Sequence, residues 1–268
     1  MLIQDKTVLL TGASGGIGKA IAKQLSEQGA RLLLVARNQQ KLEVLRQSLS
    51  APERHQSLSI DLLSSHDIKR LKSVALDYQQ QGQTISVVIN NAGSNQFRFL
   101  RQRSTESLQQ EMQLNLMAPI ILSQAALDWI SRPGIILNIG STFGSIGYPG
   151  YASYCAAKAG VHRFSEAMDR ELDGTGIRML YLAPRATDTE LNSDAVCQLN
   201  QQLGNHSDLP QIVAQHVLNI LQHEHRAKWI GWPEKLFARV NQIFPSLVAN
   251  SIRKQQATIH QFINHNSQ

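Results

Sequence analysis

Tyr154 and Lys158 lie four residues apart in the segment Tyr-Cys-Ala-Ala-Lys, and Ser141 lies thirteen residues before Tyr154, after an apolar run. Side chains at this spacing share one face of a helix, so the phenol and the ammonium can enter one pocket. A neighbouring cation favours the phenolate and is expected to lower the tyrosine pKa from about 10 toward neutral pH, which suits proton transfer. An ordinary amphipathic helix can carry the same pair, with the lysine stem lying along its surface.

A glycine-rich turn, Thr11 to Gly18, joins a predicted strand at 6–10 to a predicted helix that ends at Gly29. Its glycines at 12, 16 and 18 follow the spacing T-G-x-x-x-G-x-G. Such a turn lets the backbone approach a pyrophosphate, which the N-terminus of the following helix attracts. Tight packing without a ligand is the alternative explanation.

Arg37 and Asn38 follow the second predicted strand, 31–36. In a dinucleotide fold this position faces the adenosine ribose, where an acidic residue binds the 2′-hydroxyl and an arginine suits a 2′-phosphate. Arg37 therefore favours NADP over NAD. The glycine turn adds no second basic residue, since Gly15 occupies that place. A solvated surface arginine is the alternative.

The chain resembles the classical short-chain dehydrogenase/reductase family through several motifs, which occur in the family's order over nearly the whole length. Beyond the glycine turn these are Asp61-Leu62, Asn90-Asn91-Ala92-Gly93, Asn115, Ser141, Tyr154 with Lys158, and Pro184 through Thr189. The resemblance implies that NADP(H) contacts Gly12, Ser14, Gly15, Gly16, Ile17, Gly18, Arg37, Asn38, Asp61, Leu62, Asn91, Ala92, Gly93, Tyr154, Lys158, Pro184, Arg185, Thr187 and Thr189. Without it, Asn115 would be an ordinary buried amide and Asp61 a cap for the predicted helix 64–80.

The resemblance also implies a hydride-transfer mechanism with four catalytic residues, Asn115, Ser141, Tyr154 and Lys158. Ser141 is expected to hold the substrate carbonyl oxygen by a hydrogen bond, and Tyr154 to exchange a proton with it. Lys158 is expected to lower the Tyr154 pKa and to bind the nicotinamide ribose, while Asn115 shapes its helix and holds a water. The protein orients the reactants, and the cofactor carries the electrons.

Two features depart from the family pattern. Arg185 stands where the family usually has glycine after proline, so the backbone path changes there or a charge is brought near cofactor phosphate or substrate. The glycine turn also satisfies the spacing of the family's extended branch, through Gly12, Gly15 and Gly18. Only about 80 residues follow Thr189, which are too few for that branch's added substrate domain.

The alternation of strands and helices predicts an α/β fold with one Rossmann domain, a doubly wound parallel sheet of about seven strands covered on both faces. We expect a catalytic domain at 1–233 with a substrate lid at about 190–210, and a helical extension at 234–268 packed on the same domain. The expected strands are 6–10, 31–36, 56–60, 85–90, 134–140, 176–182 and 228–232.

Composition excludes several other classes. Two cysteines, Cys155 and Cys197, are too few for a disulfide scaffold or a metal cluster, so we expect no metal. The net charge of +6 comes without a nucleic-acid motif, so no nucleic-acid partner is expected. We predict a cytoplasmic protein, because the sequence shows no signal peptide and no apolar run long enough to span a membrane. Arg98, Arg101 and Arg103 are interpreted as a solvated loop rather than a site for an anionic substrate or an acidic carrier protein.

The segment 234–254 repeats apolar side chains at helical spacing, with basic residues between them. It is interpreted as a helix over the substrate pocket or at a subunit interface, and membrane contact is the alternative. The tail 255–268 is polar and expected to fray. Assembly as a homodimer or homotetramer through helices at 105–129 and 152–172 is expected from the resemblance.

The leading hypothesis is an NADP(H)-dependent enzyme that interconverts a ketone and a secondary alcohol. Phe143, Tyr148 and Tyr151 suggest an apolar pocket for a small-molecule carbonyl or alcohol, with an acyl group on an acyl-carrier protein as one option. Two alternatives are a membrane-peripheral, lipid-modifying reductase and a dinucleotide-sensing protein without turnover. Retention of Ser141, Tyr154, Lys158 and Asn115 together disfavours the sensing protein.

Overall fold

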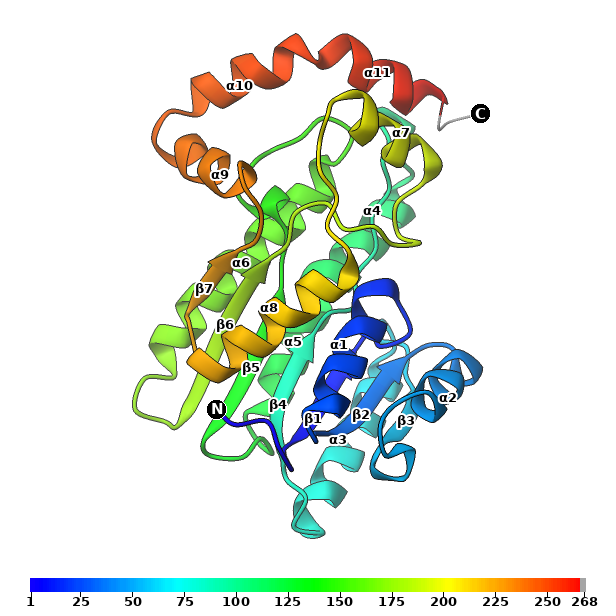
Figure 1. Ribbon diagram of the computed structural model, residues 1–268, viewed down its shortest axis with the longest axis vertical. Helices are drawn as coiled ribbons and strands as arrows, with labels where there is room; N and C mark the ends of the chain where they lie inside the picture. The colour runs from blue at the N-terminus through cyan, green and yellow to red at the C-terminus, as the bar shows by residue number, and fades with distance from the viewer. Residues whose placement is uncertain (266–268) are drawn as a thin grey trace.

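Strands and helices alternate along the chain in a computed structural model that describes residues 1–265 (Figure 1). The strands are β1 (Thr7–Thr11), β2 (Arg31–Ala36), β3 (Gln56–Ser59), β4 (Ile85–Asn90), β5 (Gly134–Ile139), β6 (Ile177–Ala183) and β7 (Ala227–Trp229). The helices are α1 (Gly16–Glu27), α2 (Gln39–Gln47), α3 (Ser65–Gln80), α4 (Thr105–Met112), α5 (Ala118–Ala126), α6 (Ala152–Glu171), α7 (Asp194–Gln202), α8 (Pro210–His223), α9 (Glu234–Ile243), α10 (Pro245–Lys254) and α11 (Gln256–His265).

All seven strands pair in parallel in the order β3-β2-β1-β4-β5-β6-β7. The central strands β1, β4 and β5 are buried along their whole length, which explains their continuous apolar sequences. The chain order reverses between β1 and β4, so a crevice opens at their carboxyl ends, where ligands bind in such sheets. This confirms the predicted single-domain, doubly wound Rossmann fold.

Two apolar clusters fix the helices on opposite faces of the sheet. On one face Ile21 and Leu25 of α1 are buried with Val217 of α8. On the other face Leu71 of α3 and Leu122 of α5 are buried together with other core residues. Both clusters hold side chains from the same central strands, because successive strand residues point to opposite faces.

The helix expected at 105–129 is interrupted. It consists of α4, a π-helical turn η3 (Gln113–Met117) and α5. A π turn inserts one residue into the helical repeat and is frequent at functional sites. It places Asn115 where the helix passes the end of β4.

The C-terminal helices α9, α10 and α11 cross one end of the molecule (Figure 1). The expectation that 255–268 frays is wrong for 256–265, because α11 buries Ile259 and Ile263 against Val196 and Leu199 of α7. Residues 266–268 lie outside the described part of the chain. Among residues 1–265, no helix is both long enough and apolar enough to cross a membrane.

Candidate active site

The glycine turn after β1 is tied to the loop after β4. Gly12 has a φ of +63° and accepts a hydrogen bond from the Asn91 side-chain nitrogen at 3.2 Å. The Thr11 hydroxyl accepts a bond from the Ala92 backbone nitrogen at 3.1 Å. A Cβ at Gly18 would stand 2.1 Å from the Gly12 carbonyl oxygen, so only glycine lets the helix start so close to the turn. These contacts explain four of the predicted cofactor positions, Gly12, Gly18, Asn91 and Ala92, by close packing.

The start of α1 is open toward the crevice. Gly15 occupies the N-cap, and in residues 1–265 no side-chain hydrogen bond caps this helix. A Cβ at Gly15 would meet only the Gly12 carbonyl oxygen, at 3.4 Å, among the described atoms nearby. At Gly16 a Cβ would come within 2.6 Å of Thr189, so the loop after β6 reaches the same point. Uncapped backbone N–H groups at this end can receive a phosphate.

The residues predicted to bind the adenosine lie at the carboxyl ends of β2 and β3. Arg37 is exposed, and its carbonyl oxygen accepts a hydrogen bond from the Ser59 hydroxyl at 2.8 Å. Asn38 caps α2 with its side-chain oxygen. Asp61 does not cap α3, because Ser64 does so. Both Arg37 and Asp61 therefore remain at the edge where a nucleotide would lie.

A cavity of about 320 Å³ opens beyond the crevice. Of the predicted site residues, it is lined by Ile17, Asn91, Gly93, Asn115, Ser141, Tyr154, Lys158, Pro184, Arg185, Thr187 and Thr189. Phe143, Tyr148 and Tyr151 line it as expected for an apolar pocket. Further walls come from Leu199 of α7 and from Val248 and Ile252 of α10. The segments 190–210 and 234–254 thus both contribute to the pocket.

The family resemblance also implies that Asn90 lines the cofactor groove, but Asn90 does not line this cavity. Its side chain is buried in the sheet and donates a hydrogen bond to the Asn138 side-chain oxygen at 2.7 Å. Asn138 in turn donates to the Ser165 hydroxyl at 2.8 Å. Asn90 therefore holds β4 to β5 and α6 rather than a ligand.

Ser141, Tyr154 and Lys158 meet at one wall of the cavity. The Ser141 hydroxyl accepts a hydrogen bond from the Phe143 backbone nitrogen at 3.1 Å and is hydrogen-bonded to Tyr154. The Lys158 ammonium donates to the Ile139 carbonyl oxygen at 3.0 Å and lies 5.7 Å from the centre of the Tyr154 ring. This arrangement can present two hydroxyl protons to one ligand oxygen.

The expected low pKa of Tyr154 is not what the surrounding protein produces. Burial raises the pKa of Tyr154 to about 12, although its hydrogen bond with Ser141 acts in the opposite direction. Burial lowers the pKa of Lys158 to about 8, because the charged form loses its hydration. Desolvation is the largest cause of the shift on each group, and the Lys158 ammonium is hydrogen-bonded to a backbone carbonyl.

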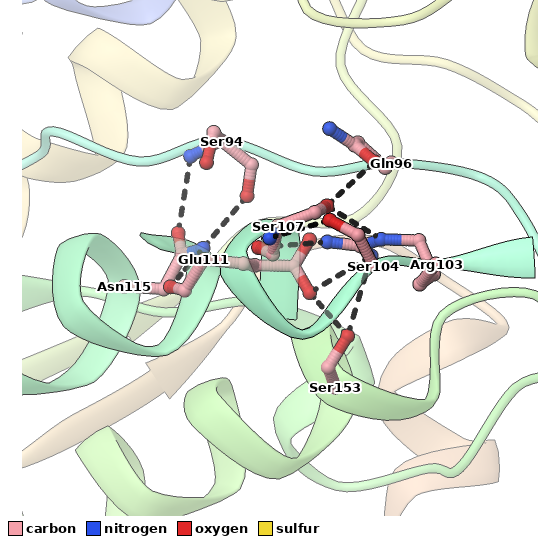
Figure 2. Close-up of polar contacts among 8 residues, drawn as sticks. All are labelled: Ser94, Gln96, Arg103, Ser104, Ser107, Glu111, Asn115 and Ser153. Atoms are coloured by element: carbon pink, nitrogen blue, oxygen red, sulfur yellow. Dashed lines mark hydrogen bonds and ion pairs between the residues drawn. The ribbon is translucent and has the colours of Figure 1, made fainter. Parts of the chain in front are cut away.

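Asn115 ties the π turn to the loop after β4 (Figure 2). Its side-chain oxygen accepts from the Ser94 nitrogen at 3.1 Å, and its side-chain nitrogen donates to the Ser94 and Glu111 carbonyl oxygens at 2.7 and 3.0 Å. A Cβ at Gly93 would stand 2.8 Å from the Asn115 oxygen and 3.7 Å from the Lys158 nitrogen. Glycine is therefore needed where the loop passes between these two side chains.

A buried ion pair lies beside the start of α6 and was not predicted (Figure 2). Arg103 and Glu111 are each 3% exposed at the side chain and are paired at 3.3 Å. Ser153, the residue before Tyr154, donates a hydrogen bond to the same carboxylate oxygen, and Arg103 also donates to the Ser107 hydroxyl at 2.9 Å. The interpretation of the arginine cluster as a solvated loop is wrong for Arg103, because Glu111 faces it from the next helix.

Tyr181 of β6 supports the loop that carries Ser141, and this role was also not predicted. Its hydroxyl donates to the Ser141 carbonyl oxygen at 3.3 Å and accepts from the Ser141 nitrogen at 3.4 Å. A Cβ at Gly140 would lie 2.2 Å from this ring, and one at Gly144 would lie 2.8 Å from its hydroxyl. His162 stacks on the other side of the ring at 4.6 Å. A tyrosine inside an apolar strand gives no sequence signal of such a role.

Arg185 forms ion pairs with two carboxylates from the C-terminal part of the chain. Its guanidinium is 2.7 Å from Asp208 and 3.3 Å from Glu234, and it also donates to the Trp232 carbonyl oxygen. The residue therefore lines the cavity while joining the end of the 190–210 segment to the start of α9.

These features are those of an oxidoreductase built on a dinucleotide-binding sheet, and the comparisons agree. A family model described as short chain dehydrogenase matches residues 6–200, so the chain belongs to the short-chain dehydrogenase/reductase family. It is 35% identical over 214 residues to the 3-oxoacyl-acyl-carrier-protein reductase FabG of Haemophilus influenzae, covering 78% of this chain and 84% of that protein.

Two solved structures show the same fold. A short-chain dehydrogenase from Sphingobium yanoikuyae in complex with NADPH has a TM-score of 0.75 at 25% identity, covering 91% of this chain and 95% of its own. A short chain dehydrogenase/reductase from Burkholderia phymatum in complex with NAD has a TM-score of 0.81 at 17% identity, covering 92% and 96%. Both dinucleotides thus occur among proteins of this fold.

Proposed function

We propose that this protein is an NADP(H)-dependent oxidoreductase that interconverts a ketone and a secondary alcohol, with an apolar or acyl-like substrate. The observation that carries the proposal is the pair of hydrogen-bonded hydroxyls, Ser141 and Tyr154, on the wall of an apolar cavity. The likeness to a 3-oxoacyl-acyl-carrier-protein reductase supports an acyl-like substrate.

The residues present fit a dinucleotide cofactor. The uncapped start of α1 at Gly15 would hold the pyrophosphate, and Thr189 would lie beside the nicotinamide. The exposed guanidinium of Arg37 would pair with a 2′-phosphate, which supports NADP(H). When bound, the nicotinamide supplies the hydride in reduction and accepts it in oxidation.

The protein supplies the proton and the geometry. In reduction the carbonyl carbon gains a hydride, and its oxygen gains the Tyr154 proton. The Ser141 hydroxyl would donate a hydrogen bond to the same oxygen, while one of its lone pairs accepts from the Phe143 nitrogen. A Tyr154 pKa of about 12 keeps the phenol protonated at neutral pH, so it is ready to act as a donor. Asn115 holds the loop after β4 through its hydrogen bond with Ser94. Lys158 keeps its ammonium near the Tyr154 ring.

Replacement of the proton donor tests the reaction. Tyr154→Phe is expected to reduce NADPH oxidation with any accepted ketone by about 10²–10⁴-fold, while NADPH affinity stays nearly unchanged. Absorbance of NADPH across a panel of ketones measures turnover, and fluorescence titration measures affinity. Tyr78→Phe removes a tyrosine hydroxyl that is bonded to Gln56 and does not line the cavity, and it serves as the control. Comparable turnover in Tyr154→Phe would refute the assignment.

The same assay tests the choice of cofactor. Arg37→Asp should weaken NADPH binding by about 10- to 100-fold through loss of a charged hydrogen bond, and should relatively favour NADH. An unchanged preference in this variant would show that another residue reads the adenosine ribose.

A further inference from the structure

A set of exposed apolar side chains lies between residues 232 and 247, from just before α9 to the start of α10. It consists of Trp232, Leu236, Ile243, Phe244 and Leu247, which are 69%, 45%, 70%, 59% and 61% exposed, and is called the α9–α10 patch. Leu236 and Ile243 are seven residues apart and therefore share one face of α9. Large exposed apolar patches on soluble proteins commonly mark interaction sites.

The opposite face of α9 is fixed to the catalytic domain. Ala238 is buried, and the Asn241 side chain donates to the Ser145 carbonyl oxygen at 2.9 Å. Ser145 also accepts a hydrogen bond from the Trp229 ring nitrogen at 3.1 Å. Because this face of α9 packs against the domain, the α9–α10 patch points away from it.

The charge around the patch has one sign. From residue 235 to the end of the sequence there are four basic side chains and no aspartate or glutamate: Lys235, Arg239, Arg253 and Lys254. All four are exposed. The carboxylate of Glu234, at the start of α9, is paired with Arg185.

We propose that the α9–α10 patch docks on an anionic lipid bilayer. A helix face that carries Trp, Phe, Ile and Leu beside lysine and arginine has the composition of an interfacial segment, and its cations add attraction to anionic headgroups. A second copy of this chain fits less well. In a symmetric contact the patch meets itself, so four cations would face four cations without a carboxylate between them.

Docking in this way would orient the cavity. Phe237 of α9 and Val248 and Ile252 of α10 line the cavity, so the same two helices carry both the patch and part of the pocket wall. Figure 1 shows these helices at the opposite end of the molecule from α2. The bilayer would thus face the part of the pocket wall that α9 and α10 form.

Trp232 provides the test. It is the strongly exposed tryptophan, whereas Trp129 is 1% exposed and Trp229 is half-buried. The full chain is mixed with vesicles of phosphatidylcholine alone or with one-third phosphatidylglycerol. We expect a blue shift of the fluorescence and flotation with the anionic vesicles, both weakened by salt. Ile243→Ser with Leu247→Ser should weaken binding by more than about 100-fold. Leu2→Ser with Val44→Ser removes two side chains of similar exposure elsewhere and should bind as the parent does.

Three results would overturn the proposal. They are no flotation with anionic vesicles, flotation that the patch double variant retains, and a parent dimer in sedimentation equilibrium that this variant converts to monomer. The last would identify the patch as a subunit interface. Ketone reduction measured without vesicles is expected to be equal in parent and patch variant, so failure of the membrane proposal is distinguishable from failure of the enzymatic one.

Discussion

At the scale of single residues, burial is the largest cause of the pKa shifts of Tyr154 and Lys158 on the cavity wall. Tyr154 and Lys158 line the same cavity, and burial favours the neutral form of each. It raises the pKa of Tyr154 to about 12 and lowers the pKa of Lys158 to about 8. The Lys158 ammonium is steadied by the Ile139 carbonyl oxygen. Within the protein's own residues, Lys158 is therefore the group of this pair that titrates nearer to neutral pH.

This difference predicts the pH dependence of the reductive reaction. Below pH 8 both Lys158 and Tyr154 carry their protons, so reduction should be fastest there. As the pH rises through about 8, Lys158 loses its charge, and kcat should fall by about tenfold per pH unit. Initial rates of ketone reduction between about pH 6 and 10 measure this profile. Lys158→Arg keeps its charge over that range, so its profile should be flat even if its rate is lower. A parent profile without a decline near pH 8 would contradict the argument.

At the scale of elements, the positions of the central strands along the chain could be predicted from the sequence, because a strand buried on both faces has a continuous apolar sequence. Leu32 to Val35 and Val87 to Ile89 are such runs. The glycine turn and the Tyr154–Lys158 spacing likewise depend on local backbone geometry. These features are visible in a few consecutive residues.

The π turn and the buried ion pair could not be predicted in the same way. The π turn carries Asn115, whose side chain is bonded to the backbone of a distant loop at Ser94. Arg103 appeared solvated because its partner, Glu111, is brought to it by α4, which begins between the two residues (Figure 2). Such contacts depend on tertiary packing, which cannot be inferred from short segments of the sequence taken one at a time.

The buried pair leads to a prediction for α4 and α6. Glu111→Leu leaves Arg103 charged and buried, and should lower the free energy of unfolding by about 3–5 kcal/mol. Arg103→Met with Glu111→Leu removes both charges and should come much closer to the parent. Ser153→Ala, which removes a hydrogen bond to Glu111 and a longer one from Arg103 but leaves both charges, should cost about 1 kcal/mol. Urea unfolding of the variants gives these values. A double variant that costs the sum of its two single changes would disprove the coupling.

At the scale of the whole molecule, the pocket is assembled from the sheet and from two later segments, and Arg185 joins all three. It lies two residues after the end of β6, it pairs with Asp208 near the end of the 190–210 segment, and it pairs with Glu234 at the start of α9. Its side chain is 15% exposed and that of Asp208 is 6% exposed, so the contact is well shielded from water. One side chain in place of the family's glycine thus connects the expected lid to the C-terminal helices.

Removal of this connection should loosen both segments while leaving the sheet intact. Arg185→Ala strands the buried carboxylate of Asp208, so the opening free energy of 190–208 and of α9 should fall by about 2–3 kcal/mol. Hydrogen exchange followed by peptide mass measures this local change, with the amides of β1 and β4 as an internal reference. Arg54→Ala removes an exposed ion pair with Asp5 and should cost less than about 1 kcal/mol anywhere. The substrate KM should rise in Arg185→Ala, because a loosened wall orders more of itself on binding. If exchange in 190–208 and α9 is unchanged, then packing of α11 on α7 alone closes the pocket, and the arginine has no part in holding it.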